Sequence, residues 1–404
     1  MGLSEGQQQR LRLRVTPAAE RAIRSGHPWV FGDSVKEENR PGQTGELAVI
    51  YDKENRFLAV GLYDPGSPLR VRILHKGKPA TIDAQWWTHR LAQTVERRAG
   101  LFDEKTDGYR CIHGESDGWP ALVLDRYASA YVLKLYSAAW FPRLHEIKEL
   151  LIAQFSPERM ILRLSRNIQD TARKTGLSDG QLLMGSELEG PVIFRETGLH
   201  FEADVIHGQK TGFFLDQREN RREVEQLSAG RTVLNAFSFS GGFSVYAARG
   251  GAKSVTDLDI SAHALESSRR NFRLNLGEPK VAASRHDCIQ ADAFEWLART
   301  GEKFGLVILD PPALAKKQSE RTDAMHGYRR LIGSGLQRVD QGGILVAASC
   351  SAHISDKEFF DITQEVFRRS GRRFEELLRT AQPPDHPATF DEAKYLKCIY
   401  YRER

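Results

Sequence analysis

Five short apolar runs in the C-terminal half alternate with segments of helical character, and this alternation restricts the fold more than any other feature. The runs, all beyond about residue 230, are TVLNAF, SVTDLDI, CIQADAF, FGLVILD and GGILVAAS. Each has the length of a buried strand, and strands alternating with helices are typical of a parallel sheet covered on both faces. The sequence therefore predicts a doubly wound, Rossmann-like α/β domain whose strands end at one common edge.

The first half of the chain has a different pattern. Residues 10–76 contain short β-rich runs separated by Gly and Pro, which predicts a small all-β, barrel-like domain. Apolar residues at helical spacing predict a helix over 81–105; a strand hairpin within 113–137 and a helix near 141–154 should follow. We therefore expect three domains: residues 1–78 (β-barrel-like), 79–192 (α+β) and 193–404 (α/β).

Charge and cysteine content restrict the class of protein. The formal net charge is +5, and residues 1–80 hold 13 Lys and Arg against 9 Asp and Glu, a balance compatible with nucleic-acid binding. The four cysteines form no CxxC pair, which argues against a disulfide framework or a cysteine zinc site. Apolar stretches are too short to span a bilayer, and no targeting segment is visible. We expect a soluble, cytoplasmic protein without a membrane partner.

A candidate ligand site follows the first strands of the α/β domain. The first strand runs through Asn235 into a turn that contains Phe237 and Gly241, and such a turn lets the backbone approach a ligand at the sheet edge. Asp259 ends the second strand, where a carboxylate can accept hydrogen bonds from both ribose hydroxyls. Asp292 ends the third strand and can receive an adenine amino group. A nicotinamide dehydrogenase could share the first two features.

The fourth and fifth strands end in residues that a dehydrogenase would not explain. The fourth ends in Asp310-Pro311-Pro312 and the fifth in Ser349-Cys350-Ser351, so both ends reach the edge that carries Asp259. Proline fixes φ and stiffens the loop, so that a flipped base would meet a preformed edge of donors and acceptors. The tripeptide looks like the motif with which methyltransferases position a target base.

Taken together, these motifs resemble the family of bacterial large-subunit rRNA cytosine-C5 methyltransferases over essentially the whole chain. The most specific match is the block GQKTGFFLDQRENR at 208–221; GHPWVF, VRIL, ESDGWPALVLDRY, LNAFSFSGGF, LDPP and YLK support it. The resemblance implies an N-terminal PUA domain that binds RNA, a small α+β domain and a class I methyltransferase domain. It also implies S-adenosylmethionine as cofactor and large-subunit ribosomal RNA as partner.

The family's chemistry identifies candidate catalytic residues. Thiolate addition to C6 would make cytosine C5 nucleophilic, and Cys350 is the cysteine at the strand edge that carries Asp310. Asp310 is expected to bond the cytosine N3/N4 edge. The base that removes the C5 proton stays open among Asp310, His386 and Glu392.

The resemblance also extends the cofactor site. Lys210 and Arg218 are expected to contact the cofactor carboxylate or an RNA phosphate, or else to stabilise the domain boundary. The cofactor-binding residues expected from the motifs are Asn235, Phe237, Gly241, Asp259, Ser261, Asp292, Asp310, Lys210, Phe214 and Arg218.

Several alternatives remain at this point. The same scaffold could methylate another base atom such as guanine N7, which needs no thiolate, or a small molecule. A different class of function is a ribosome-assembly factor that binds RNA and cofactor without turnover. A homodimer is left open, as are the modified nucleotide and the assembly stage of the substrate.

Overall fold

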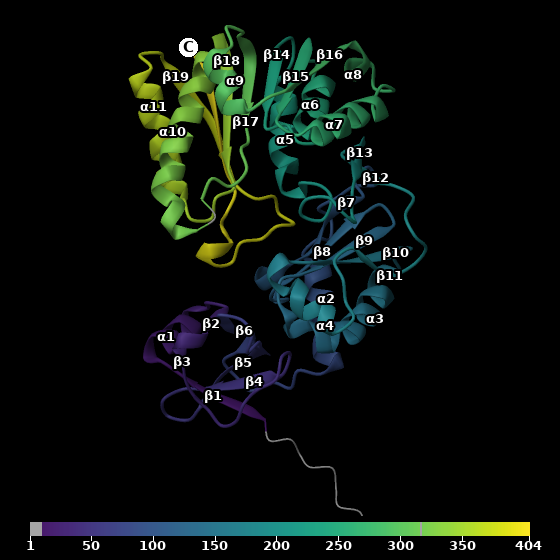
Figure 1. Ribbon diagram of the computed structural model, residues 1–404, viewed down its shortest axis with the longest axis vertical. Helices are drawn as coiled ribbons and strands as arrows, with labels where there is room; N and C mark the ends of the chain where they lie inside the picture. The colour runs from purple at the N-terminus through teal and green to yellow at the C-terminus, as the bar shows by residue number, and fades with distance from the viewer. Residues whose placement is uncertain (1–9, 316) are drawn as a thin grey trace, which may run out of the picture. The chain divides into compact units, whose positions relative to one another are not determined.

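The computed structural model describes residues 10–315 and 317–404, and these form two compact units. The first unit takes the described residues up to Phe102, with Gly108–Val192 and Ala203–Phe213. The second takes Asp103–Asp107, Ile193–Glu202 and Phe214–Arg404. Figure 1 shows their elements. The boundaries expected at 78/79 and 192/193 stay predictions.

The first unit begins with a six-stranded sheet in the order β2-β6-β5-β4-β1-β3, in which only β1 and β4 pair in parallel. Its strands are β1 Leu11–Val15, β2 Trp29–Phe31, β3 Val35–Glu38, β4 Leu47–Tyr51, β5 Phe57–Tyr63 and β6 Leu69–Lys76. This confirms the expected barrel-like β fold. The expectation of an all-β domain was incomplete, however, because helix α1 (Pro17–Ser25) lies between β1 and β2. Thr16 caps it, Pro17 starts it, and Gly26 ends it at a φ of 104°.

A second sheet of the first unit has the order β11-β10-β9-β8-β7. Its elements are α2 Ala84–Glu96, β7 Gly108–His113, β8 Leu122–Tyr127, β9 Ala130–Leu135, α3 Leu144–Phe155, β10 Arg159–Leu164, α4 Gln169–Lys174 and β11 Gln181–Met184. The expected hairpin and the helix near 141–154 correspond to β8–β9 and α3. The helix expected over 81–105 is shorter, because Asp83 caps α2 and the helix ends at Glu96.

The second unit contains a seven-stranded sheet in the order β16-β15-β14-β17-β18-β20-β19. Its strands are β14 Thr232–Ala236, β15 Ser254–Asp259, β16 Arg285–Gln290, β17 Phe304–Leu309, β18 Val339–Ser349, β19 Phe374–Thr380 and β20 Lys397–Glu403. The hairpin β12 (Val192–Glu196) and β13 (Leu199–Ala203) precedes it in the chain. The first five strands run in parallel, as expected. The antiparallel pair β19 and β20 completes the sheet beside β18.

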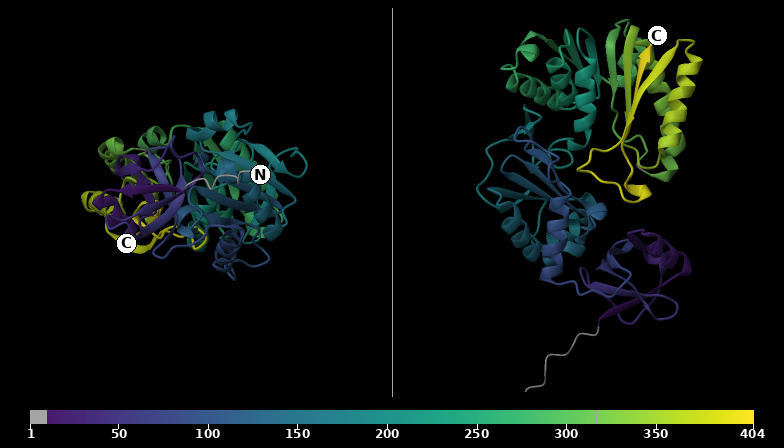
Figure 2. Two further views of the ribbon diagram at one scale, coloured as in Figure 1. Left: turned by 90° about the horizontal axis from the view of Figure 1, so that it is seen from below. Right: turned by 180° about the vertical axis from the view of Figure 1, so that it is seen from behind.

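Helices cover both faces of this sheet (Figures 1 and 2). They are α5 Arg218–Leu227, α6 Gly242–Arg249, α7 Ala262–Leu274, α8 Pro279–Ala283, α9 Ala293–Arg299, α10 Arg321–Gln337 and α11 Asp356–Arg369. Leu297, Tyr328 and Phe359 of α9–α11 pack with β14 and β17 in one apolar core. The result is the doubly wound α/β fold that the sequence predicts. Within the described part of the chain, no helix is long and apolar enough to cross a membrane.

Candidate active site

The carboxyl ends of the parallel strands bring most of the predicted site residues to one edge of the sheet. Asp259 ends β15, Asp310 directly follows β17 and Cys350 directly follows β18. Strands β15 and β17 flank β14, and β18 flanks β17. Ligands bind at this edge in open α/β sheets, at the point where the strand order reverses. The reversal lies beside β14, so the loop from β14 to α6 borders the place where a ligand is expected.

The loop between β14 and α6 has an unusual backbone. Phe237, Phe239 and Gly241 have φ values of 62°, 48° and 72°, and left-handed backbone is uncommon for residues other than glycine. The buried hydroxyl of Ser238 in the same loop has no hydrogen-bond partner among the described residues. A buried polar group without a partner points to a ligand that would supply one. The loop therefore fits a bound cofactor with polar groups.

Asp259 faces this loop and keeps capacity for a ligand. Its Oδ2 accepts from the backbone N of Phe239 at 2.9 Å, and its Oδ1 accepts from the backbone N of Ser261 at 2.9 Å. Each carboxylate oxygen can accept a second hydrogen bond, as a ribose diol requires. Ile260, the next residue, is 68% exposed. The sequence analysis missed this side chain, which offers an apolar surface beside the acid.

Two predicted residues have packing roles that the sequence does not reveal. A Cβ on Gly241 would collide with Ser268 Oγ, so the contact with α7 already requires glycine there. The amide of Asn235 is buried and donates to Ser244 Oγ and to Asp257 Oδ1, each at 3.0 Å. Both residues hold the loop in place from beneath.

The remaining residues around the loop fall into two groups. Phe214 packs edge-on against Phe239 at 4.9 Å between ring centroids, and Phe237 packs edge-on against Phe294 at 5.8 Å. Asp292 caps α9 by accepting from the backbone N of Glu295 at 3.0 Å. Aromatic side chains thus border the loop, while part of the Asp292 carboxylate serves the helix.

Asp310 receives a hydrogen bond from a residue that the sequence analysis did not single out. Gln217 Nε2 donates to Asp310 Oδ2 at 2.9 Å. Gln217 lies inside the 208–221 block, in the 3-10 turn Leu215–Gln217 that leads into α5, and is 3% exposed. The position of Gln217 in the most specific motif was the one feature of the sequence that could have indicated a role at the site.

Cys350 is partly exposed in a rigid setting. Its Sγ lies 3.9 Å from the Pro311 carbonyl oxygen, to which it can donate. Ser349 and Ser351 on either side are fully buried, and both hydroxyls hydrogen-bond to the hydroxyl of Tyr328, at 2.8 and 2.9 Å. The loop is therefore fixed on both sides of Cys350, and Cys350 itself is only partly buried beside the Asp310-Pro311-Pro312 turn.

The other cysteines differ from Cys350. Cys398 on β20 is fully buried, and burial raises the pKa of its thiol to about 12, which disfavours a thiolate. Cys111 is buried in the first unit, and Cys288 lies on β16 beside His286. Among the four, only Cys350 is accessible next to Asp310.

A buried lysine anchors the segment that follows Cys350. Lys397 Nζ donates to the carbonyl oxygens of Ser351 at 2.7 Å and Ile354 at 2.6 Å, and the residue is 1% exposed. Burial lowers the pKa of Lys397 to about 8. Its motif YLK was visible in the sequence, but this contact was not.

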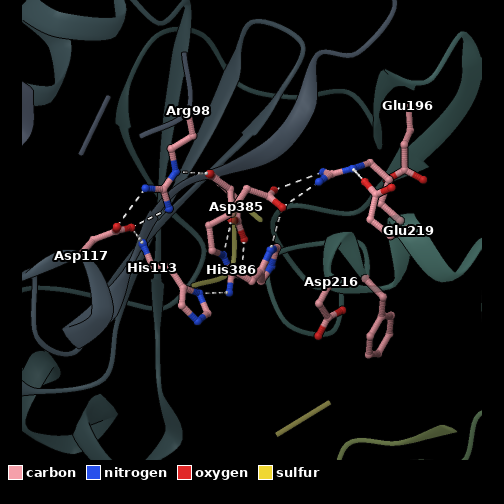
Figure 3. Close-up of polar contacts among 12 residues, drawn as sticks. Arg98, His113, Asp117, Glu196, Asp216, Glu219, Asp385 and His386 are labelled. Atoms are coloured by element: carbon pink, nitrogen blue, oxygen red, sulfur yellow. Dashed lines mark hydrogen bonds and ion pairs between the residues drawn. The ribbon is translucent and has the colours of Figure 1, made fainter. Parts of the chain in front are cut away.

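Arg218 is engaged in a buried ion pair with Asp385, which Figure 3 labels together with Glu219 and His386. Its Nη2 lies 2.7 Å from Asp385 Oδ1, and its Nε donates to Glu219 at 3.0 Å. Burial disfavours the Asp385 carboxylate, but His386 and Arg218 outweigh this effect and hold its pKa well below the usual range. The Arg218 charge is thus matched by acids of the same unit.

The other candidate residues lie in varied settings. Lys210 belongs to the first unit, where its carbonyl oxygen accepts from Lys134 Nζ at 2.7 Å. Of the candidate bases, His386 is buried 3.2 Å from Asp385, and Glu392 is exposed. The cofactor contacts expected of Lys210 and Arg218, and the choice of base, stay predictions.

Known proteins resemble this chain in sequence and in structure. Residues 109–402 match the S-adenosylmethionine-dependent methyltransferase family, and residues 13–76 match the PUA-like domain. A ribosomal RNA large subunit methyltransferase of Deinococcus radiodurans is 57% identical over 97% of each chain. A ribosomal RNA large subunit methyltransferase I of Shewanella denitrificans is 34% identical over 97% of this chain and 99% of its own.

A solved structure from Streptococcus mutans shares the fold. It is 20% identical, has a TM-score of 0.81, and the match covers 97% of this chain and 100% of the other. A second solved methyltransferase structure with the same score was obtained in complex with SAH. The fold, the family match and the β14–α6 loop, whose Ser238 hydroxyl has no partner among the described residues, all agree with a methyltransferase domain that binds a cofactor. The chain belongs to the S-adenosylmethionine-dependent methyltransferase family and carries a PUA-like domain at its N-terminal end.

Proposed function

We propose that this methyltransferase acts on C5 of a cytosine in large-subunit ribosomal RNA, through a covalent adduct with Cys350. The observation that carries the proposal is an accessible thiol held beside Asp310, on the sheet edge that also carries Asp259. A methyltransferase acting on a nitrogen atom has no need of such a thiol. The rRNA substrate is taken from the names of the relatives that match almost the whole chain.

The chain's own residues account for the bond changes. The Cys350 thiolate adds to C6, and the electron pair of the C5–C6 double bond shifts toward C5 and attacks the methyl carbon. A base then removes the C5 proton, and the electrons of that C–H bond restore the double bond and expel the thiolate. Asp310 holds the N3/N4 edge of the base and is one candidate for the proton acceptor. Bound S-adenosylmethionine supplies the electrophilic methyl group and keeps the electron pair of its broken S–CH₃ bond.

The cofactor would be held by the β14–α6 loop and the acids that surround it. Asp259 accepts from the ribose hydroxyls, Ser238 offers its hydroxyl, and Ile260 packs against the adenine. Asp292 receives the adenine amino group through the part of its carboxylate that does not cap α9. Phe214 and Phe237 border the same space.

The PUA-like domain would bind the RNA. We place its boundary at 78/79, followed by an α+β domain to 192 and the methyltransferase domain from 193 to 404. The enzyme acts in the cytoplasm, where ribosomal subunits assemble. We leave open a homodimer in solution.

The test combines one substitution with a mechanism-based trap. Cys350→Ala should bind S-adenosylmethionine normally yet lose methyl transfer, because it removes the nucleophile that adds to C6. RNA that carries 5-fluorocytidine should trap the wild-type enzyme as a denaturant-resistant adduct, since fluorine at C5 cannot leave as a proton does. Gel electrophoresis under denaturing conditions detects the adduct, and mass mapping of rRNA identifies the methylated base.

The matched control is Cys288→Ala, which removes a partly exposed thiol from the same unit and should still trap. Full methylation by Cys350→Ala would end the C5 mechanism. Methylation of guanine N7 by the wild-type enzyme would replace it with the alternative chemistry on the same scaffold.

A further inference from the structure

Gln217 is the last link of a buried hydrogen-bond chain that ends on Asp310. Asn220 Nδ2 donates to Gln217 Oε1 at 2.5 Å, and Gln217 Nε2 donates to Asp310 Oδ2 at 2.9 Å. Asn220 Oδ1 in turn accepts from Thr380 Oγ1 at 2.5 Å and from Tyr400 Oη at 3.0 Å. Asn220 is 1% exposed and Gln217 is 3% exposed, so water does not compete for these contacts.

The chain fixes which end of each amide faces which neighbour. An ionised carboxylate only accepts hydrogen bonds, so Gln217 presents Nε2 to Asp310 and Oε1 to Asn220. Asn220 then faces Gln217 with Nδ2, and its Oδ1 accepts from the two hydroxyl groups. A flipped Gln217 would set oxygen against the Asp310 carboxylate and nitrogen against Asn220 Nδ2, which would break two buried hydrogen bonds. A neutral donor is therefore locked against one oxygen of Asp310.

This arrangement controls what Asp310 can do. A hydrogen bond donated to a carboxylate favours its ionised form, and it also fixes the plane of the group. An ionised carboxylate can accept several hydrogen bonds, so the bond from Gln217 leaves Asp310 able to accept from a ligand as well. An ionised acceptor placed against position 4 of the base can accept from the N4 amino group of cytosine, whereas the O4 carbonyl of uracil offers no donor at that position.

We propose that Gln217 is a positioning residue that keeps Asp310 ionised and aimed as a hydrogen-bond acceptor for the target base, so that it sets the preference for cytosine. The inference rests on the proposed function, because it takes the base edge from the C5 reaction. It gives the central residues of the 208–221 block a task at the methyl-transfer site.

Gln217→Glu tests the proposal, because it keeps the shape and replaces the donor by an acid. Two carboxylates in contact cannot both ionise readily, so they share one proton at low pH. The protonated acid at position 217 can then donate to Asp310 as glutamine does, and kcat/KM should approach the wild-type value there. Above the pKa of the pair, kcat/KM should fall by about tenfold per pH unit, a decline that the wild-type profile does not contain.

Two further variants complete the test. Gln217→Leu cannot donate at any pH and should lower kcat/KM throughout without this added decline. Gln226→Glu makes the same change at an exposed position of α5 and should keep the wild-type profile. Affinity for S-adenosylmethionine, measured by calorimetry, should be unchanged in all three, and the thermal midpoint of each confirms folding.

The outcomes separate this inference from the proposed function. A Gln217→Glu profile parallel to that of the wild type, or wild-type kcat/KM in Gln217→Leu, would overturn the role of Gln217. In Gln217→Leu, the kcat/KM for RNA with uridine at the target position should rise relative to the kcat/KM for RNA with cytidine there. An unchanged ratio of these two values would overturn the role of Gln217 in specificity. If the wild type methylates an atom other than C5, the proposed function fails, while the pH profiles still decide whether Gln217 controls Asp310.

Discussion

At the scale of single residues, a buried carboxylate that the sequence analysis did not identify supports the β14–α6 loop. Asp257 is fully buried, and its Oδ1 accepts from Ser244 Oγ at 2.5 Å and from Asn235 Nδ2 at 3.0 Å. Its Oδ2 accepts from Ser268 Oγ and lies 2.8 Å from His286 Nε2. Burial opposes protonation of His286, but Asp257 and, after it, Cys288 outweigh this effect, and the pKa of the imidazole rises to about 9.

This pair should make the stability of the protein depend on pH. The pKa of His286 is about 9 in the folded chain and 6.5 ordinarily, so the folded state binds the proton more tightly. The stabilisation is fully present below pH 6.5 and is lost as the pH rises through 9, by an amount on the order of 2–3 kcal/mol. In His286→Gln this decline should vanish. Urea denaturation between pH 6 and 9.5 measures it.

The matched control for His286 is His263→Gln, an exposed histidine of α7, which should keep the wild-type decline. Equal pH dependence in the wild type and His286→Gln would show that the pair contributes nothing to stability. Asp257 holds Asn235 and Ser244 beneath the β14–α6 loop. The affinity for S-adenosylmethionine should therefore also decline as the pH rises through 9.

Position in the sequence alone identifies those site residues that end or directly follow a buried strand. Asp259, Asp310 and Cys350 could be found because each follows a recognisable buried strand, and parallel strands end at one edge. Gln217 and Asp257 act through neighbours remote in the sequence, 93 residues away for the contact between Gln217 and Asp310. Such a contact exists only in the folded chain, and no local pattern encodes it.

At the scale of elements, helix α5 is tied to the rest of its unit by buried charges. Arg218, its first residue, pairs with Asp385 in the loop between β19 and β20. Arg221 Nη2 lies 2.7 Å from Glu196 Oε2 on β12, and both side chains are buried. The helix follows Gln217 directly and carries Asn220, so these pairs also hold the two amides of the hydrogen-bond chain that ends on Asp310.

Arg218→Met should destabilise the protein by about 3 kcal/mol or more, because it leaves the Asp385 carboxylate buried without its arginine. The double variant Arg218→Met/Asp385→Asn removes the stranded charge and should recover a substantial part of that loss. Urea denaturation at neutral pH measures both. A double variant no more stable than the single one would show that burial of the charge is not the cause.

The sequence predicted elements well where periodicity decides and less well where local capping or sheet pairing decides. The five parallel strands overlap the short runs that alternate with helical segments in the sequence, and they were found. Helix α1 was missed because its nine residues are mostly polar or small, and its caps at Thr16 and Gly26 were the stronger signal. The residues of β19 are half-buried or exposed and form no apolar run. Only the pairing of this segment with β20 makes it a strand.

At the scale of the whole molecule, the first unit joins two sheets through a shared core. Leu62 and Leu74 of the six-stranded sheet pack in the same apolar cluster as Trp87 and Trp119 of the following segment. Arg72 Nη1 lies 3.0 Å from Glu115 Oε1. Removing residues 1–78 would expose this core, so the RNA-binding role of the PUA-like domain is better tested by surface substitutions.

The end of β6 at Lys76 offers exposed positive charge. Lys76 and Lys78 are exposed, and a Cβ on Gly26 would lie 3.2 Å from Lys76 Nζ, which places the ammonium at the end of α1. Phe31 on β2 is 47% exposed but lies opposite Leu69, at the other end of β6. Exposed basic side chains suit a nucleic-acid backbone.

Lys76→Gln/Lys78→Gln should weaken RNA binding and reduce its dependence on salt. Each phosphate contact that is lost lowers the slope of log K against log salt concentration by about 0.7–0.9, because fewer counterions are released. Filter binding across a salt series measures the slope, and affinity for S-adenosylmethionine should not change. Lys53→Gln/Arg56→Gln removes two charges from the turn between β4 and β5 of the same sheet and should leave the slope unaltered. Equal slopes for the wild type and the Lys76/Lys78 variant would mean that this surface does not carry the RNA.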